Sequence, residues 1–180
     1  TFVTAALSFA DVAVAETRTI FAVDISGTST FLHDPRSAEA AGSWVEQYIA
    51  ALEAPHALRM LSLGDAGLAH LQIDVAATVT ELRASSAARL APKFNEFFRS
   101  LPKLVAEGKI SVQGTSSILA FLRSVEPVCQ QGNATVVLFT DGLEWSSTVD
   151  GKAFFEGAVG LPTAGRISDR PRRPHHLLVC

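Results

Sequence analysis

Thr19-Ile20-Phe21-Ala22-Val23-Asp24-Ile25-Ser26-Gly27-Thr28 is the segment from which we infer the architecture of this chain. Residues 20–23 are apolar at consecutive positions, which is typical of a central parallel strand because both of its faces are buried. An acid and two hydroxyl residues follow at alternate positions: Asp24, Ser26 and Thr28. Since open α/β sheets bind ligands at the carboxyl ends of their strands, we expect a binding site at these three side chains.

A second segment, Thr135-Val136-Val137-Leu138-Phe139-Thr140-Asp141-Gly142, repeats this pattern of an apolar strand that ends at an acid and a glycine. Between the two segments, Thr115 lies in the hydroxyl-rich stretch 114–117, just before a helical pattern. The three loops together offer two carboxylates and three hydroxyls. Such hard oxygen ligands suit Mg²⁺ or a similar cation.

The motif Asp24-Ile25-Ser26-Gly27-Thr28, the later Thr115 and the strand ending Thr140-Asp141-Gly142 resemble the metal-ion-dependent adhesion site of von Willebrand factor type A domains. The one departure from the family's motif is Thr28, at a position where Ser is commoner, and Thr also supplies a hydroxyl. The resemblance spans residues 19–180. It implies an α/β, Rossmann-like fold with three layers and a doubly wound, mostly parallel sheet. The implied strand order is 3-2-1-4-5 with one antiparallel edge strand, and the family would continue beyond residue 180 through another helix and a sixth strand.

The resemblance also implies roles for the five side chains. Ser26, Thr28 and Thr115 would ligate Mg²⁺, or Mn²⁺ or Ca²⁺, directly. Asp24 and Asp141 would hold its waters or ligate at longer range. Neutral ligands leave most of the cation's charge uncompensated, so an open position attracts an anionic oxygen, in this family an Asp or Glu carboxylate of a partner protein. The expected function is therefore protein binding without catalysis.

Two other interpretations of Asp24 remain open. The loop also resembles the D-x-D-G-T loop of haloacid-dehalogenase-type phosphatases, in which the first Asp is the nucleophile. Here Ser26 replaces the acid that protonates the leaving group, and Lys152, the nearby lysine, is followed by no acidic pair. Alternatively, Asp24 and Asp141 only cap loops at strand ends, in a domain that binds no metal.

Length and composition fit one globular domain. The chain has 180 residues, enough for one core, and is 48% hydrophobic and 18% charged, unlike a disordered chain. A net charge of −3 gives no overall electrostatic basis for binding nucleic acid or an anionic membrane. No apolar run approaches the length of a membrane-spanning helix.

A basic cluster lies near the end of the chain: Arg166, Arg170, Arg172, Arg173, His175 and His176. It is interpreted as a solvated loop, with nucleic-acid binding as the alternative.

Residues 1–18 are expected to be an N-terminal extension or the remnant of a signal peptide, followed by the domain over 19–180. Residues 1–15 are small and apolar and end Ala13-Val14-Ala15, which is typical of a secretory cleavage site, although Asp11 argues against it. A signal peptide would imply export to the periplasm or the exterior. Without one, a cytoplasmic location is expected.

The two cysteines, Cys129 and Cys180, form neither a disulfide framework nor a zinc site. One bridge between them is conceivable. Two free, buried thiols are the simpler expectation.

Periodicity and turn residues predict the remaining elements. Asp34 and Pro35 indicate the start of a helix that continues to about Glu53. A helical segment over 79–104 is expected to be broken or kinked at its prolines. Further strands are predicted over 58–63, 68–75 and 177–179, the first two as an antiparallel hairpin.

Overall fold

The computed structural model describes residues 17–63, 71–142 and 175–179, the last of these by backbone alone. They form an α/β fold around one mixed, five-stranded sheet. The strands are β1 (Thr17–Asp24), β2 (His56–Leu63), β3 (Asp74–Val79), β4 (Ala134–Phe139) and β5 (His175–Val179). The helices are α1 (Pro35–Ala50), α2 (Ala87–Ala106) and α3 (Ile118–Gln130), with short 3₁₀ helices η1 (Thr30–Leu32) and η2 (Arg83–Ser85).

The sheet has the order β3-β2-β1-β4-β5, as expected. Strand β1 pairs in parallel with β2 and β4, and β3 forms the expected antiparallel edge against β2. Strand β5 is also antiparallel, so the prediction of a single antiparallel edge is wrong. The reason lies in the register. His175 pairs with Phe139, the last residue of β4, so β5 starts at the edge where β4 ends and must return alongside it.

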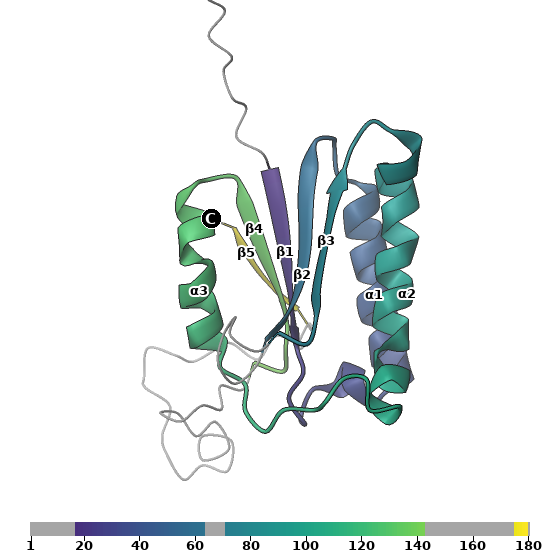
Figure 1. Ribbon diagram of the computed structural model, residues 1–180, viewed down its shortest axis with the longest axis vertical. Helices are drawn as coiled ribbons and strands as arrows, with labels where there is room; N and C mark the ends of the chain where they lie inside the picture. The colour runs from purple at the N-terminus through teal and green to yellow at the C-terminus, as the bar shows by residue number, and fades with distance from the viewer. Residues whose placement is uncertain (1–16, 64–70, 143–174, 180) are drawn as a thin grey trace, which may run out of the picture.

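Both faces of the sheet carry helices among the described residues. Helices α1 and α2 lie on one face and α3 lies on the other (Figure 1). Alternate residues of β1 supply the two cores. Phe21 and Val23 belong to the α1–α2 side, whereas Ile20 and Ala22 belong to the α3 side. The consecutive apolar run in β1 is thus buried on both faces, as the sequence predicts.

Helix α1 begins where the sequence places it. The Asp34 carboxylate accepts hydrogen bonds of 3.1 Å from the backbone N–H groups of Arg36 and Ser37, and Pro35 occupies the first helical position. These bonds satisfy donors that have no partner inside the helix. The helix ends at Ala50, three residues before the predicted end.

Helix α2 is continuous through Pro92 and Pro102, so of the predicted break or kink at the prolines, the break is wrong. Each proline removes one backbone hydrogen bond. The helix is nevertheless held along its length by an apolar stripe buried against the core: Leu90, Ala91, Phe94, Phe98 and Leu101. Burial of these side chains outweighs the lost bonds, because each large apolar side chain contributes roughly 1.5–3 kcal/mol.

Strand β3 occupies 74–79 rather than the predicted 68–75, and residues 64–70 lie outside the described part of the chain. The core-facing positions of β3 include Ala77 and Val79, which pack in the α1–α2 core. Ala77 is too small to mark the alternation of apolar residues that identifies a strand. The sequence therefore placed the strand too early.

Several sequence-based predictions concern residues outside the described part of the chain. These include the extension before residue 17, Lys152 and the arginines of the basic cluster. Cys180 also lies outside. Cys129, near the end of α3, is disulfide-bonded, so the expectation of two free thiols is wrong.

Candidate metal site at the carboxyl edge of the sheet

Two neighbouring strand ends bring the first part of the candidate site together. Val23 pairs with Phe139 in the parallel register of β1 and β4, so Asp24 and Thr140 follow side by side. Thr140 Oγ1 donates a 2.7 Å hydrogen bond to Asp24 Oδ2 and accepts one from Gly142 N at 3.1 Å. Asp24 is fully buried and Thr140 nearly so.

A third loop joins the site by pairing with the loop after β1. Gln113 N donates to Ile25 O at 2.9 Å, and Gly27 N donates to Gln113 O at 3.1 Å. The connection from α2 to α3 thereby runs along the lower edge of the sheet in Figure 1. This pairing fixes the next residues of the connection, and Ser116 Oγ donates a 3.0 Å hydrogen bond to Asp24 Oδ2.

The Asp24 carboxylate is the centre of this network. Its Oδ1 accepts a 2.9 Å hydrogen bond from Ser26 N, so donors from three loops converge on one side chain. Burial raises the pKa of Asp24 above its ordinary value of 3.8, and the hydrogen bonds from Ser26, Thr140 and Ser116 oppose that rise. Within the described residues, no Lys, Arg or His forms an ion pair with it.

Two hydroxyls lie together beside this carboxylate. Ser26 Oγ and Thr28 Oγ1 are 3.3 Å apart. Ser26 is 4% exposed, whereas Thr28 and the neighbouring Gly27 are exposed. The loop therefore offers oxygen atoms that extend from the buried acid to the surface.

The five predicted ligands are not equally connected. Hydrogen bonds link Asp24, Ser26 and Thr28 locally. Thr115 and Asp141 are half-buried, and each is the immediate chain neighbour of a residue that bonds to Asp24. Ser116 and Thr140, whose hydroxyls make those bonds, are not among the site residues predicted from the sequence. The only signal for them was their place in the hydroxyl-rich loop and at the strand end.

The donor set is dominated by hydroxyls. Within the described residues, no group of three or more His, Cys, Asp or Glu side chains could hold a metal ion. The candidate site contains only Asp24 and Asp141 from that set, and its other ligands would be Ser and Thr oxygens. Its fit to a cation therefore depends on the hydroxyls and on the uncompensated charge of Asp24.

Aromatic packing fixes the two loops that flank Asp24. Phe139 directly precedes Thr140 and packs against Phe98, with ring centroids 4.7 Å apart. Phe31, three residues after Thr28, meets the Phe139 ring in an edge-to-face arrangement, with ring centroids 6.5 Å apart. Both phenylalanines are buried. The loops therefore leave a rigid core, and little ordering of their backbones would be needed for a ligand to bind.

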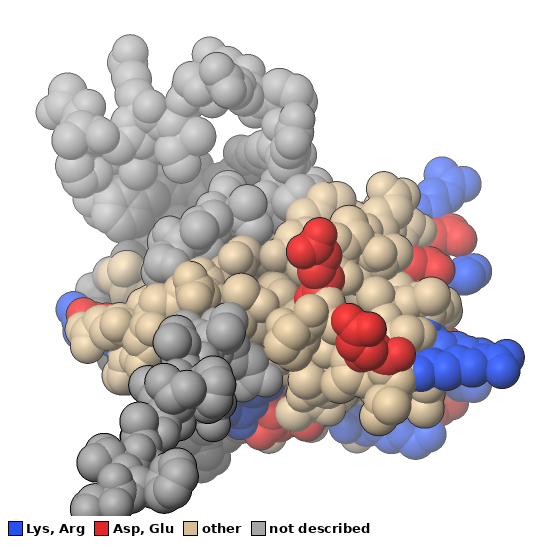
Figure 2. Space-filling model, turned by 90° about the horizontal axis from the view of Figure 1, so that it is seen from above, with Lys and Arg blue, Asp and Glu red and all other residues tan. Residues whose placement is uncertain are grey.

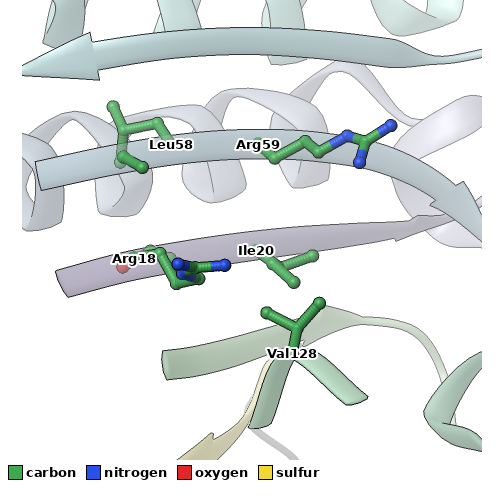
Figure 3. A pocket seen from close by; sticks show the side chains of 7 residues that line it. Arg18, Ile20, Leu58, Arg59 and Val128 are labelled. Atoms are coloured by element: carbon green, nitrogen blue, oxygen red, sulfur yellow. The ribbon is translucent and has the colours of Figure 1, made fainter. Parts of the chain in front are cut away.

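Other surface features lie away from this site. A groove of about 180 Å³ lies between β1, β2 and α3, where Figure 3 shows Arg18, Ile20, Leu58, Arg59 and Val128 around it. Figure 2 views the molecule from the opposite edge of the sheet and shows charges of both signs among uncharged residues on the described part of that face. No described helix is long and apolar enough to cross a membrane.

Comparisons of this chain with protein-family models, curated proteins and solved structures found no match. The resemblance to von Willebrand factor type A domains is therefore a hypothesis based on the sequence motif. The geometry of the site provides independent grounds on which to judge it.

Proposed function

We propose that this chain is a non-catalytic protein-binding module that holds Mg²⁺ at the carboxyl edge of its sheet and uses it to bind an acidic side chain of a partner protein. We also propose that its fold is the three-layer, doubly wound arrangement of von Willebrand factor type A domains. The main support is the buried carboxylate of Asp24. It accepts hydrogen bonds from three loops, but no cationic side chain among the described residues forms an ion pair with it.

A divalent cation would compensate this charge. Removing a carboxylate from water is costly unless it is paired, and three hydrogen bonds from neutral groups offset only part of that cost. The adjacent hydroxyls of Ser26 and Thr28 are suitable hard ligands. Thr115 and Asp141 would complete the set from the two other loops.

The position of the site suits recognition of another molecule. Gly27 and Thr28 are exposed, so the outer side of a bound cation would face solvent. With hydroxyls as its nearest ligands, the cation would keep most of its positive charge. An Asp or Glu carboxylate of a partner would then replace a water at the open position.

The environment of Asp24 argues against the phosphatase alternative. A nucleophilic carboxylate must reach the phosphorus atom of its substrate. Asp24 is fully buried, and both of its oxygens accept hydrogen bonds from the protein. Ser26, at the position of the general acid in that motif, cannot take its role.

Thermal unfolding during a Mg²⁺ titration tests the proposal. Binding to the folded state alone stabilises it by about 2.7 kcal/mol at a metal concentration one hundred times Kd. We expect Mg²⁺ to raise the Tm of the wild type and not that of Thr28→Val, which removes an exposed hydroxyl while keeping the shape. The matched control is Thr30→Val, an exposed threonine two residues further along, at the start of η1. Equal Mg²⁺ responses in the two variants would argue against the proposed site.

The acidic partner is tested separately with immobilised peptides. Peptides that contain Asp or Glu should retain the wild-type protein in Mg²⁺ and release it in EDTA. Matched peptides with Asn or Gln should not retain it. Retention that is unaffected by EDTA would contradict a metal-bridged contact.

A further inference from the structure

Strand β3 leaves one side of the sheet open among the described residues. It is the first strand in the order β3-β2-β1-β4-β5, and it pairs only with β2. Residues 74–78 are exposed or half-exposed. An edge of this kind presents backbone groups that can pair with another strand.

The register identifies which backbone groups point outward. Ser62 N donates a 2.9 Å hydrogen bond to Ile73 O, so this pair is of the hydrogen-bonded type. Hydrogen-bonded and non-bonded pairs alternate along an antiparallel ladder. The N–H and C=O groups of Asp74, Ala76 and Thr78 therefore point away from β2.

The usual protective features are absent from this six-residue strand. Its sequence, Asp74-Val75-Ala76-Ala77-Thr78-Val79, contains no Lys, Pro or Gly, and its pairing with β2 runs without a bulge. Its one charge is compensated within the chain, because Arg59 forms two hydrogen bonds with the Asp74 carboxylate, at 3.0 and 2.9 Å. Small side chains and a regular ladder make this edge suited to a further strand.

We propose that the occupant of this edge is β3 of a second copy of the chain, paired antiparallel about a two-fold axis at Ala76. In this register Ala76 lies opposite the partner's Ala76, and Asp74 lies opposite the partner's Thr78. No like charges meet, and Val75, which is 38% exposed, lies opposite the partner's Ala77. The outward N–H and C=O groups of both strands are then paired in one continuous ten-stranded sheet.

The symmetry has a consequence for the candidate metal sites. A two-fold axis between antiparallel strands is perpendicular to the sheet, so it places the α1–α2 layers of both copies on the same face. It also points the two carboxyl edges in opposite directions. The dimer would thus present two sites at opposite ends and link two partners, whereas the interface itself needs no metal.

Sedimentation velocity of the full chain over a range of concentrations, in EDTA, tests this inference. We expect a monomer–dimer equilibrium in the wild type. Ala76→Lys places two lysines opposite each other across the axis and should shift the dissociation constant at least tenfold toward the monomer. Thr78→Lys is the matched control, because it makes the same kind of change on the same face of the strand but places the new lysine opposite the partner's Asp74. It should keep or strengthen the dimer.

Both positions are exposed, so we expect both variants to fold. Circular dichroism and the Tm of each variant check this. A wild type that remains monomeric at all concentrations would overturn the proposal. Equal weakening by the two lysine variants would overturn the pairing about Ala76. Because the measurements are made without metal, their failure would leave the proposed cation site unaffected.

Discussion

Ser116 Oγ lies 3.0 Å from Asp24 Oδ2, although 92 residues separate the two in the chain. This bond connects the loop before α3 to the end of β1. It depends on the pairing of Gln113 with Ile25 and Gly27. The candidate site is therefore assembled by tertiary structure, with Asp24 as its common acceptor.

Ser116→Ala should destabilise the fold and weaken the response to Mg²⁺. The substitution removes one of the donors to a buried carboxylate, at a cost of about 1–3 kcal/mol. Urea unfolding measures the loss with and without metal. Ser100→Ala is the control, because Ser100 Oγ also donates a hydrogen bond, to Phe97 O at 2.6 Å, but on α2. A Mg²⁺ response altered equally in both variants would argue against a role for Ser116 in the site.

Asp24→Asn should stabilise the metal-free protein at neutral pH and abolish its stabilisation by Mg²⁺. Burial raises the pKa of Asp24 above 3.8, so the folded state disfavours the ionised form. The resulting loss of stability begins as the pH rises above 3.8 and is complete above the folded-state pKa. The Tm advantage of the Asn variant in EDTA should therefore grow over that window. A wild type more stable than the variant at pH 7 in EDTA would contradict this account.

Asp34→Ala should lower the Tm at neutral pH by weakening the start of α1. The side-chain hydrogen bond from Ser37 and the backbone bond from Arg36 lower the pKa of Asp34. Its ionised form is thus favoured by folding, and this contribution is present above pH 3.8 and lost as the pH falls through the lowered pKa. Asp34→Asn separates the cap from the charge, since Asn is also a good N-cap. Equal Tm losses in the two variants at pH 7 would indicate that the cap itself contributes little.

Gly42→Ala should destabilise the contact between α1 and α2. A Cβ at position 42 would lie 2.9 Å from the backbone oxygen of Asn95 and 3.2 Å from Phe98 Cβ, so the helices would have to move apart. Overpacking of this kind costs about 1–3 kcal/mol in urea unfolding. Gly114→Ala is the control, because no atom lies within 4 Å of its added Cβ. An unchanged unfolding midpoint for Gly42→Ala would show that the helices can separate at little cost.

The sequence predicted the parts of the fold that depend on local pattern and burial. The apolar run of β1 is buried on both faces, and Asp34 caps α1 as expected. The strand order also agrees with the expectation from the family resemblance. The burial of β1 and the cap of α1 follow from side-chain type at fixed spacing, whereas the strand order was implied by the resemblance.

The parts that the sequence did not predict depend on tertiary contacts. The continuity of α2 through Pro92 and Pro102 results from burial of its apolar stripe, which local propensity does not include. The direction of β5 depends on where the chain returns to the sheet. At the site, the choice of Ser116 among neighbouring hydroxyls depends on the conformation of its loop.

Electron paramagnetic resonance of Mn²⁺ during a protein titration tests the proposed cation site most directly, because it counts bound ions without requiring a partner. We predict one Mn²⁺ per chain in the wild type, displaced by Mg²⁺. Binding should be lost in Asp24→Ala and Thr28→Val and retained in Thr30→Val. A folded wild type that binds no Mn²⁺, or binding that persists in both site variants, would contradict the account.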